Sequence, residues 1–156
     1  MAKVIAVCIS PRKGMRKVDI GSARAIEEFG LEGDAHAGKW HRQVSLLSVS
    51  SIDKMRAKGL SVGPGDFAEN ITVEGLDFLS CPLGTRFTVG PSVILELTQI
   101  GKKCHAGCAI MKLAGDCVMP KEGIFARVIC GGVVNRGDKV QAMTAQDQRV
   151  QETHAL

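Results

Sequence analysis

The sequence predicts a single-domain, mainly β protein, a twisted barrel or sandwich with two or three short helices. About six to eight short strand-like runs recur along the chain, and many of its 18 glycines fall at the turns between them. The strict strand–helix alternation of a doubly wound sheet is missing, as is any phosphate-loop or dinucleotide fingerprint. A chain of 156 residues has room for one domain with a substantial core.

The first half is read as strands separated by glycine-rich loops. Its predicted strands are residues 3–9, 43–49 and 70–74, the last with apolar and polar residues in alternation. Residues 23–29 fit a short helix or a strand, because periodicity does not decide between them. The best helix candidate is 51–58, where apolar residues from Val49 to Met55 recur every third position and Gly59 supplies a stop.

The second half continues the same pattern. Its predicted strands are residues 86–89, 93–100, 124–130 and 139–143, with glycine-containing turns at 90–92 and 135–138. Residues 110–113 suit a short helix. The polar tail, 144–156, is expected to fray, so the predicted domain covers residues 2–143.

Composition excludes several classes of function. The net charge of +4 is mild and no block of like charge resembles a nucleic-acid arm; one Trp, five Phe and no Tyr give no base-stacking platform. No apolar run approaches the ~18 residues of a membrane helix. The N-terminus is too short and strand-like for a signal peptide, so a cytoplasmic protein with six thiols is expected. A small anionic ligand fits this balance better than nucleic acid or membrane.

The most reactive segment predicted is residues 97–108, where an apolar run ends and a basic, cysteine-containing loop begins. Lys102, Lys103 and His105 flank Cys104, and nearby positive charge favours the thiolate that serves as nucleophile, sulfur carrier or metal ligand. An ordinary thiol on a solvated basic loop is an equally good interpretation of the spacing alone.

A zinc site is a weaker interpretation of the same segment. Cys104, Cys108 and Cys117, with His105, could supply ligands, but the C-x3-C and C-x8-C spacings match neither paired C-x2-C knuckles nor an iron–sulfur run. Cys108 and Cys117 are therefore expected to be packed neighbours of the reactive thiol.

Two glycine-aspartate loops form the second group of candidates. In residues 33–36 the glycine would let backbone N–H groups approach an anion, while Asp34 and His36 offer an acceptor and a titratable group. Residues 65–70 repeat this chemistry with Asp66, Glu69 and Asn70. The first loop could instead be a turn in which Asp34 caps its own backbone, and Asn70 in the second could face a pocket or water.

Basic residues complete the candidates. Arg127 interrupts an apolar strand, which indicates either a carboxylate partner or an anionic ligand. His41, Arg42 and Lys121 could add anion contacts.

These segments form an ordered set that covers nearly the whole chain. The set comprises Gly33-Asp34-Ala35-His36, Arg42-Gln43-Val44-Ser45-Leu46-Leu47, Gly65-Asp66-Phe67-Ala68-Glu69-Asn70-Ile71-Thr72, Gly75-Leu76, Leu83-Gly84-Thr85-Arg86-Phe87-Thr88-Val89-Gly90, Cys104, Gly123-Ile124-Phe125-Ala126-Arg127-Val128 and Gly137-Asp138. In this order it resembles the MOSC domain, a module named after the C-terminal part of molybdenum cofactor sulfurase.

The resemblance implies a twisted β-barrel of the pyruvate-kinase-barrel type and a pocket for molybdenum cofactor or a sulfur species. It makes Cys104 the sulfur carrier or the thiolate ligand to molybdenum, roles that suit a soft sulfur ligand. The cofactor-binding residues it implies are Gly33, Asp34, His36, Arg42, Asp66, Glu69, Asn70, Lys103 and Arg127.

The resemblance also sets limits on activity. The sequence Lys103-Cys104-His105 replaces the Pro-Cys-aromatic pattern of many relatives, so the surroundings of the sulfur differ. The pyridoxal-phosphate domain of the full sulfurase has no counterpart, so pyridoxal phosphate is not expected here and a cysteine desulfurase or a molybdoenzyme is the expected partner. Three interpretations follow: a molybdenum–sulfur protein whose catalytic turnover is open, a non-catalytic cofactor carrier or insertion chaperone, and a zinc-stabilised structural module.

Overall fold

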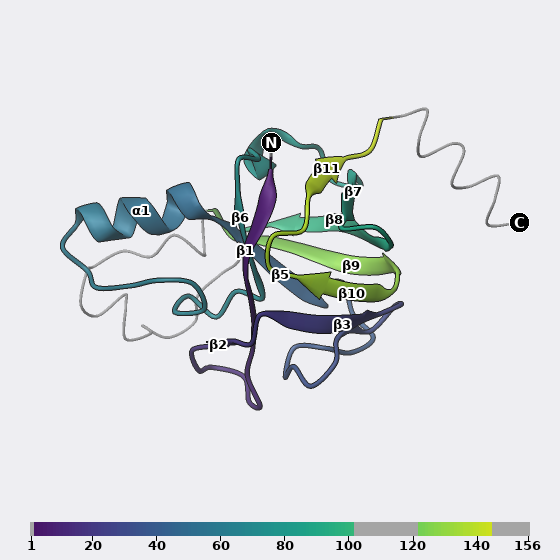
Figure 1. The fold of residues 1–156 in the computed structure, drawn as a ribbon, viewed down its shortest axis with the longest axis horizontal. Coiled ribbons are helices and arrows are strands. Elements are labelled where there is room, and N and C mark those ends of the chain that lie inside the picture. Colours follow the sequence, from purple (N-terminus) through teal and green to yellow (C-terminus); the bar gives the residue numbers. More distant parts are fainter. Residues whose placement is uncertain (1, 102–121, 145–156) are drawn as a thin grey trace, which may run out of the picture.

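The computed structural model describes residues 2–101 and 122–144, which form a mainly β fold with one α-helix and one short 3-10 helix (Figure 1). The helices are α1 (Val49–Ala57) and η1 (Phe78–Ser80). The strands are β1 (Lys3–Ile9), β2 (Val18–Asp19), β3 (Ser22–Ile26), β4 (Gly30–Leu31), β5 (Val44–Ser48), β6 (Ile71–Glu74), β7 (Arg86–Val89), β8 (Val93–Ile100), β9 (Ile124–Cys130), β10 (Gly132–Asn135) and β11 (Val140–Ala142).

The longer strands confirm the sequence predictions. β1, β7, β8 and β9 have the predicted bounds, and the ambiguous segment 23–29 contains a strand, β3. The predicted helix 51–58 begins two residues earlier, at Val49. The helix expected at 110–113 lies outside the described residues. No helix within residues 2–101 or 122–144 is long and apolar enough to cross a membrane.

Eight strands form one mixed sheet in the order β11-β7-β8-β9-β5-β6-β1-β2, and β10, β3 and β4 form a second, smaller sheet. Within the large sheet β5 and β6 run parallel, with Leu46 opposite Ile71, and the other neighbours are antiparallel. Parallel neighbours need a crossover connection, which here contains α1. Figure 1 shows α1 projecting to one side of the strands.

β1 also contacts the chain just before β11, which belongs to the opposite end of the large sheet. Lys3 forms an isolated antiparallel bridge with Lys139, and the Val4 N–H donates to the Asp138 carbonyl at 2.8 Å. No closed barrel is detected among the described strands, however. The mainly β class is therefore confirmed, and the barrel stays a prediction.

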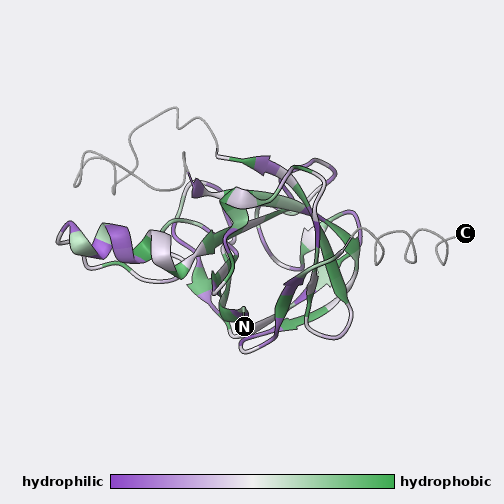
Figure 2. Cartoon of the chain, turned by 90° about the horizontal axis from the view of Figure 1, so that it is seen from above, coloured by the Kyte–Doolittle hydropathy of each residue, from purple (hydrophilic) through white to green (hydrophobic). Residues whose placement is uncertain are grey.

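Two groups of buried apolar side chains hold these elements together. The larger takes residues from both sheets, among them Val7, Leu46, Leu95 and Val134. The smaller joins α1 to the large sheet through Leu47, Ile52, Met55, Val62, Phe67 and Phe125. In Figure 2 hydrophobic residues colour much of the strands, whereas α1 carries both hydrophobic and hydrophilic residues.

Three loops meet near the start of the parallel strands β5 and β6, and backbone hydrogen bonds tie them together. The Ala35 N–H donates to the Ser10 carbonyl at 2.9 Å, and the Lys17 N–H donates to the Gly65 carbonyl at 2.8 Å. Segments around residues 10–17, 33–42 and 63–70 are thereby brought to one place, which is where most of the predicted site residues lie.

Candidate functional site

A buried lysine, Lys17, is the centre of the polar cluster where these loops meet. Its Nζ lies 2.7 Å from Asp34 Oδ1, 3.1 Å from Ser10 Oγ and 2.9 Å from His36 Nδ1. The side chains of Lys17 and Asp34 are both fully buried. The predicted residues Asp34 and His36 are therefore joined by a cation to which no sequence pattern pointed.

Asp34 is held as a carboxylate by this cluster. Burial alone would raise its pKa, but the hydrogen bond and charge of Lys17, with help from Asn70 and the Ser10 amide, hold the pKa below its usual value. The Ser10 N–H donates to Oδ1 at 3.1 Å and the His36 N–H donates to Oδ2 at 3.2 Å. The carboxylate thus accepts from two backbone amides, one in each of two loops, as well as pairing with the lysine.

Beside His36, the Trp40 ring is contacted by two cationic side chains. The Trp40 indole N–H donates to the His36 carbonyl at 2.8 Å, and the two rings lie nearly parallel. Lys13 Nζ lies 4.7 Å and Arg42 Cζ 4.6 Å from the Trp40 ring centroid, and Arg42 also lies over Phe125. Arg42 Nε is buried and has no hydrogen-bond partner among the described residues. A stacked guanidinium with an unused donor is suited to an oxygen acceptor on a ligand.

Asn70 is buried rather than facing water, and it joins three strands. Its Oδ1 accepts from the Ser45 N–H at 2.9 Å, and its Nδ2 donates to the Cys8 carbonyl at 3.0 Å. Ala68, two residues earlier, has a positive φ of 63°, a conformation that non-glycine residues rarely adopt outside sites fixed by their surroundings. Asn70 therefore anchors the end of the loop 63–70 to β1 and β5.

Glu69 is also fully buried, beside the Cys8 thiol. Its Oε2 accepts from Thr72 Oγ1 at 2.9 Å, while Oε1 has no hydrogen-bond partner in the described structure. Burial raises the pKa of Glu69. Burial, followed by the charge of Glu69, raises the pKa of Cys8 to about 12. This thiol stays protonated, so Cys8 is not a reactive cysteine.

Gly33 and Asp66 both stabilise turns, Gly33 by its backbone conformation and Asp66 by a hydrogen bond. Gly33 has a φ of +84°, which only glycine adopts readily. Asp66 Oδ2 accepts from the Gly63 N–H at 2.8 Å, and Arg16 lies 3.8 Å from its other oxygen. Asp66 therefore closes its own turn and contacts a partly exposed arginine.

Of the predicted basic ligands, Arg127 has carboxylate partners and Lys103 lies outside the described residues. Arg127 Nε lies 3.0 Å from Glu96 Oε1, and Nη1 lies 2.9 Å from Glu28 Oε1. Glu96 also accepts from Arg86 at 3.1 Å. The carboxylate-paired alternative for Arg127 is the one found, and these contacts do not connect it to the cluster around Lys17.

Cys104 lies outside the described residues as well, but both ends of its segment are described. The Gly101 N–H donates to the Gly123 carbonyl at 2.7 Å, so the described residues on the two sides of the segment are hydrogen-bonded to each other. Nearby, Gln99 Oε1 lies 2.6 Å from His41 Nε2, next to Trp40 and Arg42 in sequence. Among residues 2–101 and 122–144 there is no group of three His, Cys, Asp or Glu side chains that could hold a metal ion.

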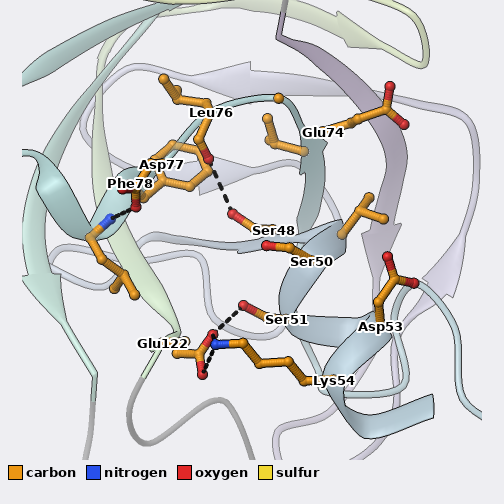
Figure 3. A pocket seen from close by; sticks show the side chains of 14 residues that line it. Ser48, Ser50, Ser51, Asp53, Lys54, Glu74, Leu76, Asp77, Phe78 and Glu122 are labelled. Atoms are coloured by element: carbon orange, nitrogen blue, oxygen red, sulfur yellow. Dashed lines mark hydrogen bonds and ion pairs between the residues drawn. The ribbon is translucent and has the colours of Figure 1, made fainter. Parts of the chain in front are cut away.

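A cavity of about 630 Å³ lies elsewhere, at the other end of the β5–β6 pair and beside the start of α1 (Figure 3). Its polar groups largely satisfy one another: Ser51 Oγ donates to Glu122 Oε1 at 2.7 Å, Lys54 Nζ donates to the same oxygen at 3.0 Å, and Ser48 Oγ donates to the Leu76 carbonyl. It contains none of the predicted site residues.

Comparison with solved structures identifies this architecture. YuaD protein from Bacillus subtilis superposes with a TM-score of 0.74 at 19% identity, covering 91% of this chain and 96% of that one. YiiM from Geobacillus stearothermophilus gives a TM-score of 0.68 at 16% identity, covering 92% and 76%. YiiM from Escherichia coli gives 0.60 at 22% identity, covering 92% and 70%.

Two comparisons were made at the level of sequence, one with curated proteins and one with family models. A search of curated proteins returns no match. The family model of the MOSC domain matches residues 33–141, which include the loops around Asp34 and Asn70 and the segment containing Cys104. The chain therefore belongs to the MOSC domain family.

Proposed function

We propose that this protein binds molybdenum cofactor, or a related molybdenum–sulfur species, at the loops around Lys17 and Arg42. Family membership supports a role related to this cofactor. The observation that carries the proposal is Arg42 Nε, a buried donor without a partner in the described structure, on a guanidinium stacked over Trp40 and Phe125. A pterin phosphate or a molybdenum oxo group is an anionic oxygen acceptor of the kind that such a donor requires.

The burial of each predicted residue decides whether we propose that it contacts the ligand or shapes the loops. Arg42 and His36 are half-buried and can reach a ligand. Asp34, Glu69 and Asn70 are buried and contact the protein interior, so we assign them to shaping the loops. Lys103 keeps its proposed role as an anion contact.

We propose Cys104 as the thiolate ligand to molybdenum or as a carrier of persulfide sulfur. When bound, the cofactor would supply redox and sulfur-transfer chemistry that protein side chains lack. The basic neighbours of Cys104 in the sequence favour the thiolate, the form that binds a soft metal or holds a transferable sulfur. A cysteine desulfurase or a molybdoenzyme is the partner we propose.

The decisive experiment compares Cys104→Ala with Cys108→Ala. Each purified protein is analysed for molybdenum content and for persulfide labelling. We expect Cys104→Ala to lose at least one signal and Cys108→Ala to keep both. Wild-type levels of both signals in Cys104→Ala would refute the assigned role of this cysteine.

A second comparison tests the anion site itself. Arg42→Lys keeps the charge but loses the planar, stacked guanidinium, so we expect it to retain less cofactor than the wild type. Arg127→Lys is the matched control, because that guanidinium is engaged by Glu28 and Glu96. Equal retention by the two variants would contradict the site.

Two alternatives differ from this proposal in measurable ways. A cofactor carrier would deliver bound cofactor to an apo-enzyme in equimolar amounts yet reduce no N-hydroxylated substrate. A structural module would contain zinc without molybdenum or pterin when freshly purified. Metal analysis and a transfer assay therefore separate the three possibilities.

A further inference from the structure

We propose that Lys17 is a positioning residue that fixes His36 as a neutral imidazole with its proton on Nε2. The ring then acts as a hydrogen-bond donor toward an oxygen atom of the ligand, and not as a base. The tautomer is a property of the free protein. Its use in recognising the ligand rests on the function proposed above.

The argument begins with the hydrogen-bond capacity of the lysine. A charged ammonium group has three N–H donors and no acceptor. Lys17 Nζ has three neighbours at hydrogen-bond distance: Asp34 Oδ1, Ser10 Oγ and His36 Nδ1. The number of donors equals the number of acceptors, so each neighbour must accept.

The direction of each bond is fixed independently. Asp34 is an acceptor because it is a carboxylate. Ser10 Oγ donates its own proton to the Arg12 carbonyl at 3.0 Å, which leaves its lone pair for the lysine. His36 Nδ1 must then carry a lone pair, and the proton of the neutral ring lies on Nε2.

The charges around His36 favour the same state. An imidazolium would place a second cation 2.9 Å from the ammonium of Lys17 and would remove the lone pair that Lys17 uses. The negative charge of Asp34 is already paired with Lys17. The ammonium of Lys17 therefore disfavours a second positive charge on the ring.

The position of the ring is fixed as well. The Trp40 indole N–H donates to the His36 carbonyl, and the two rings lie 6.5 Å apart with an angle of 7° between their planes. The His36 backbone N–H donates to Asp34 Oδ2. A donor with a fixed proton and a fixed orientation distinguishes ligands by whether they present an acceptor there, such as a carbonyl, oxo or phosphate oxygen.

The tautomer can be read directly from a two-bond proton–nitrogen correlation spectrum of the nitrogen-15-labelled free protein. The chain has four histidines, and His36→Gln identifies the signals of this one. We expect the pattern of a neutral ring protonated on Nε2. A proton on Nδ1, or an imidazolium at neutral pH, would overturn the proposal whatever ligand the protein binds.

Variants test whether Lys17 is the cause. The double variant Lys17→Met with Asp34→Asn removes both buried charges together, which spares the fold an unpaired one. We expect its His36 to show both tautomers. Lys13→Met, which removes a cation over Trp40 without touching Nδ1, is the matched control and should resemble the wild type.

Two results would refute this causal role: a double variant with the wild-type spectrum, or a control whose spectrum changes equally. The molybdenum content of the wild-type protein is measured separately. A protein with the expected tautomer and no cofactor would therefore refute the proposed function and leave the role of Lys17 standing.

Discussion

The Lys17–Asp34 pair makes each partner indispensable to the other, because neither side chain contacts solvent. Removing one partner of a buried pair leaves an unpaired charge and costs about 3–5 kcal/mol. We expect Lys17→Met to lower the free energy of unfolding by about that much, measured by urea denaturation at neutral pH.

Two controls separate the unpaired charge from the loss of a side chain. Adding Asp34→Asn to Lys17→Met should restore much of the lost stability, because no buried charge then remains. Lys54→Met removes a lysine that is 60% exposed and paired with Glu122, so it should cost at most about 1 kcal/mol. A loss no greater in Lys17→Met than in Lys54→Met would contradict the assigned burial.

Glu69 should make stability depend on pH in the sense opposite to Asp34. Because burial raises the pKa of Glu69, its contribution is complete below the unfolded-state pKa and is lost as pH rises through the folded-state pKa. Glu69→Gln does not titrate, so we expect this variant to gain stability relative to the wild type as pH rises. Urea denaturation of both proteins from acid to alkaline pH measures the difference.

Asp34 supplies the comparison within the same cluster. Its lowered pKa means that its contribution is present at neutral pH and is lost as pH falls through the folded-state pKa.

Glu74→Gln, at the exposed end of β6, is the control for the Glu69 prediction, because this glutamate is not buried. A stability difference between Glu69→Gln and the wild type that does not change with pH would show that Glu69 is not held neutral.

The sequence could suggest Asp34 and His36 because a carboxylate and an imidazole stand two residues apart in a glycine-containing loop. It could not suggest Lys17, which lies among Arg12, Lys13 and Arg16 in a loop that looks solvated. What distinguishes Lys17 is burial, and burial comes from loops distant in sequence. Burial by distant segments is also what keeps Asp34 and Glu69 away from a ligand, and the sequence could not show it.

At the scale of elements, the loop 63–70 depends on the absence of a side chain at Gly65. This residue has a φ of +88°, and a Cβ there would lie 2.2 Å from the Lys17 carbonyl oxygen. Gly59 has nearly the same φ, +91°, but faces open space. An alanine would therefore adopt the same unfavourable backbone conformation at both positions, and it would meet a steric clash only at position 65.

We expect Gly59→Ala to cost about 1–2 kcal/mol from the left-handed conformation alone. Gly65→Ala should cost about 1–3 kcal/mol more, because the loop must move away from Lys17. Urea denaturation of both variants measures the excess. Equal losses would mean that the close approach of the loop to Lys17 does not matter for stability.

The elements were predictable in proportion to their length. β1, β8 and β9 each have seven or eight residues with enough apolar, β-branched content to define a strand locally. β2 and β4 have two residues each, and only their partners make them strands. The strand β3 was ambiguous from periodicity, and its pairing with β10 resolves it.

At the scale of the molecule, the candidate site is a product of the whole sheet. The Lys17 network takes residues from the loop after β1 and the loop after β4, and Asn70 joins it from the start of β6. These segments are distant in sequence and adjacent only because the sheet orders its strands as it does. The sequence could therefore name candidates but not their neighbours.

The same long-range order brings β1 to residues 137–140. The Val4 N–H donates to the Asp138 carbonyl at 2.8 Å, and the Val140 N–H donates to the Ala2 carbonyl at 3.0 Å. End strands of an open sheet fray at low cost, whereas strands held on both sides open only with the rest of the molecule. The contact at residues 137–140 thus determines whether β1 frays locally or opens only with the rest of the molecule.

Amide hydrogen exchange measures this directly. We expect the amides of Val4 and Val140 to exchange as slowly as that of Leu97, which is buried in the large sheet and donates to the Thr85 carbonyl. The Leu79 amide, in an exposed 3-10 turn, is the fast reference. Slow exchange at Val4 and Val140 would mean that residues 137–140 extend the sheet around β1, as the predicted barrel requires. Exchange as fast as that of Leu79 would mean that the sheet is open there and that the first half of β1 is held by β6 alone.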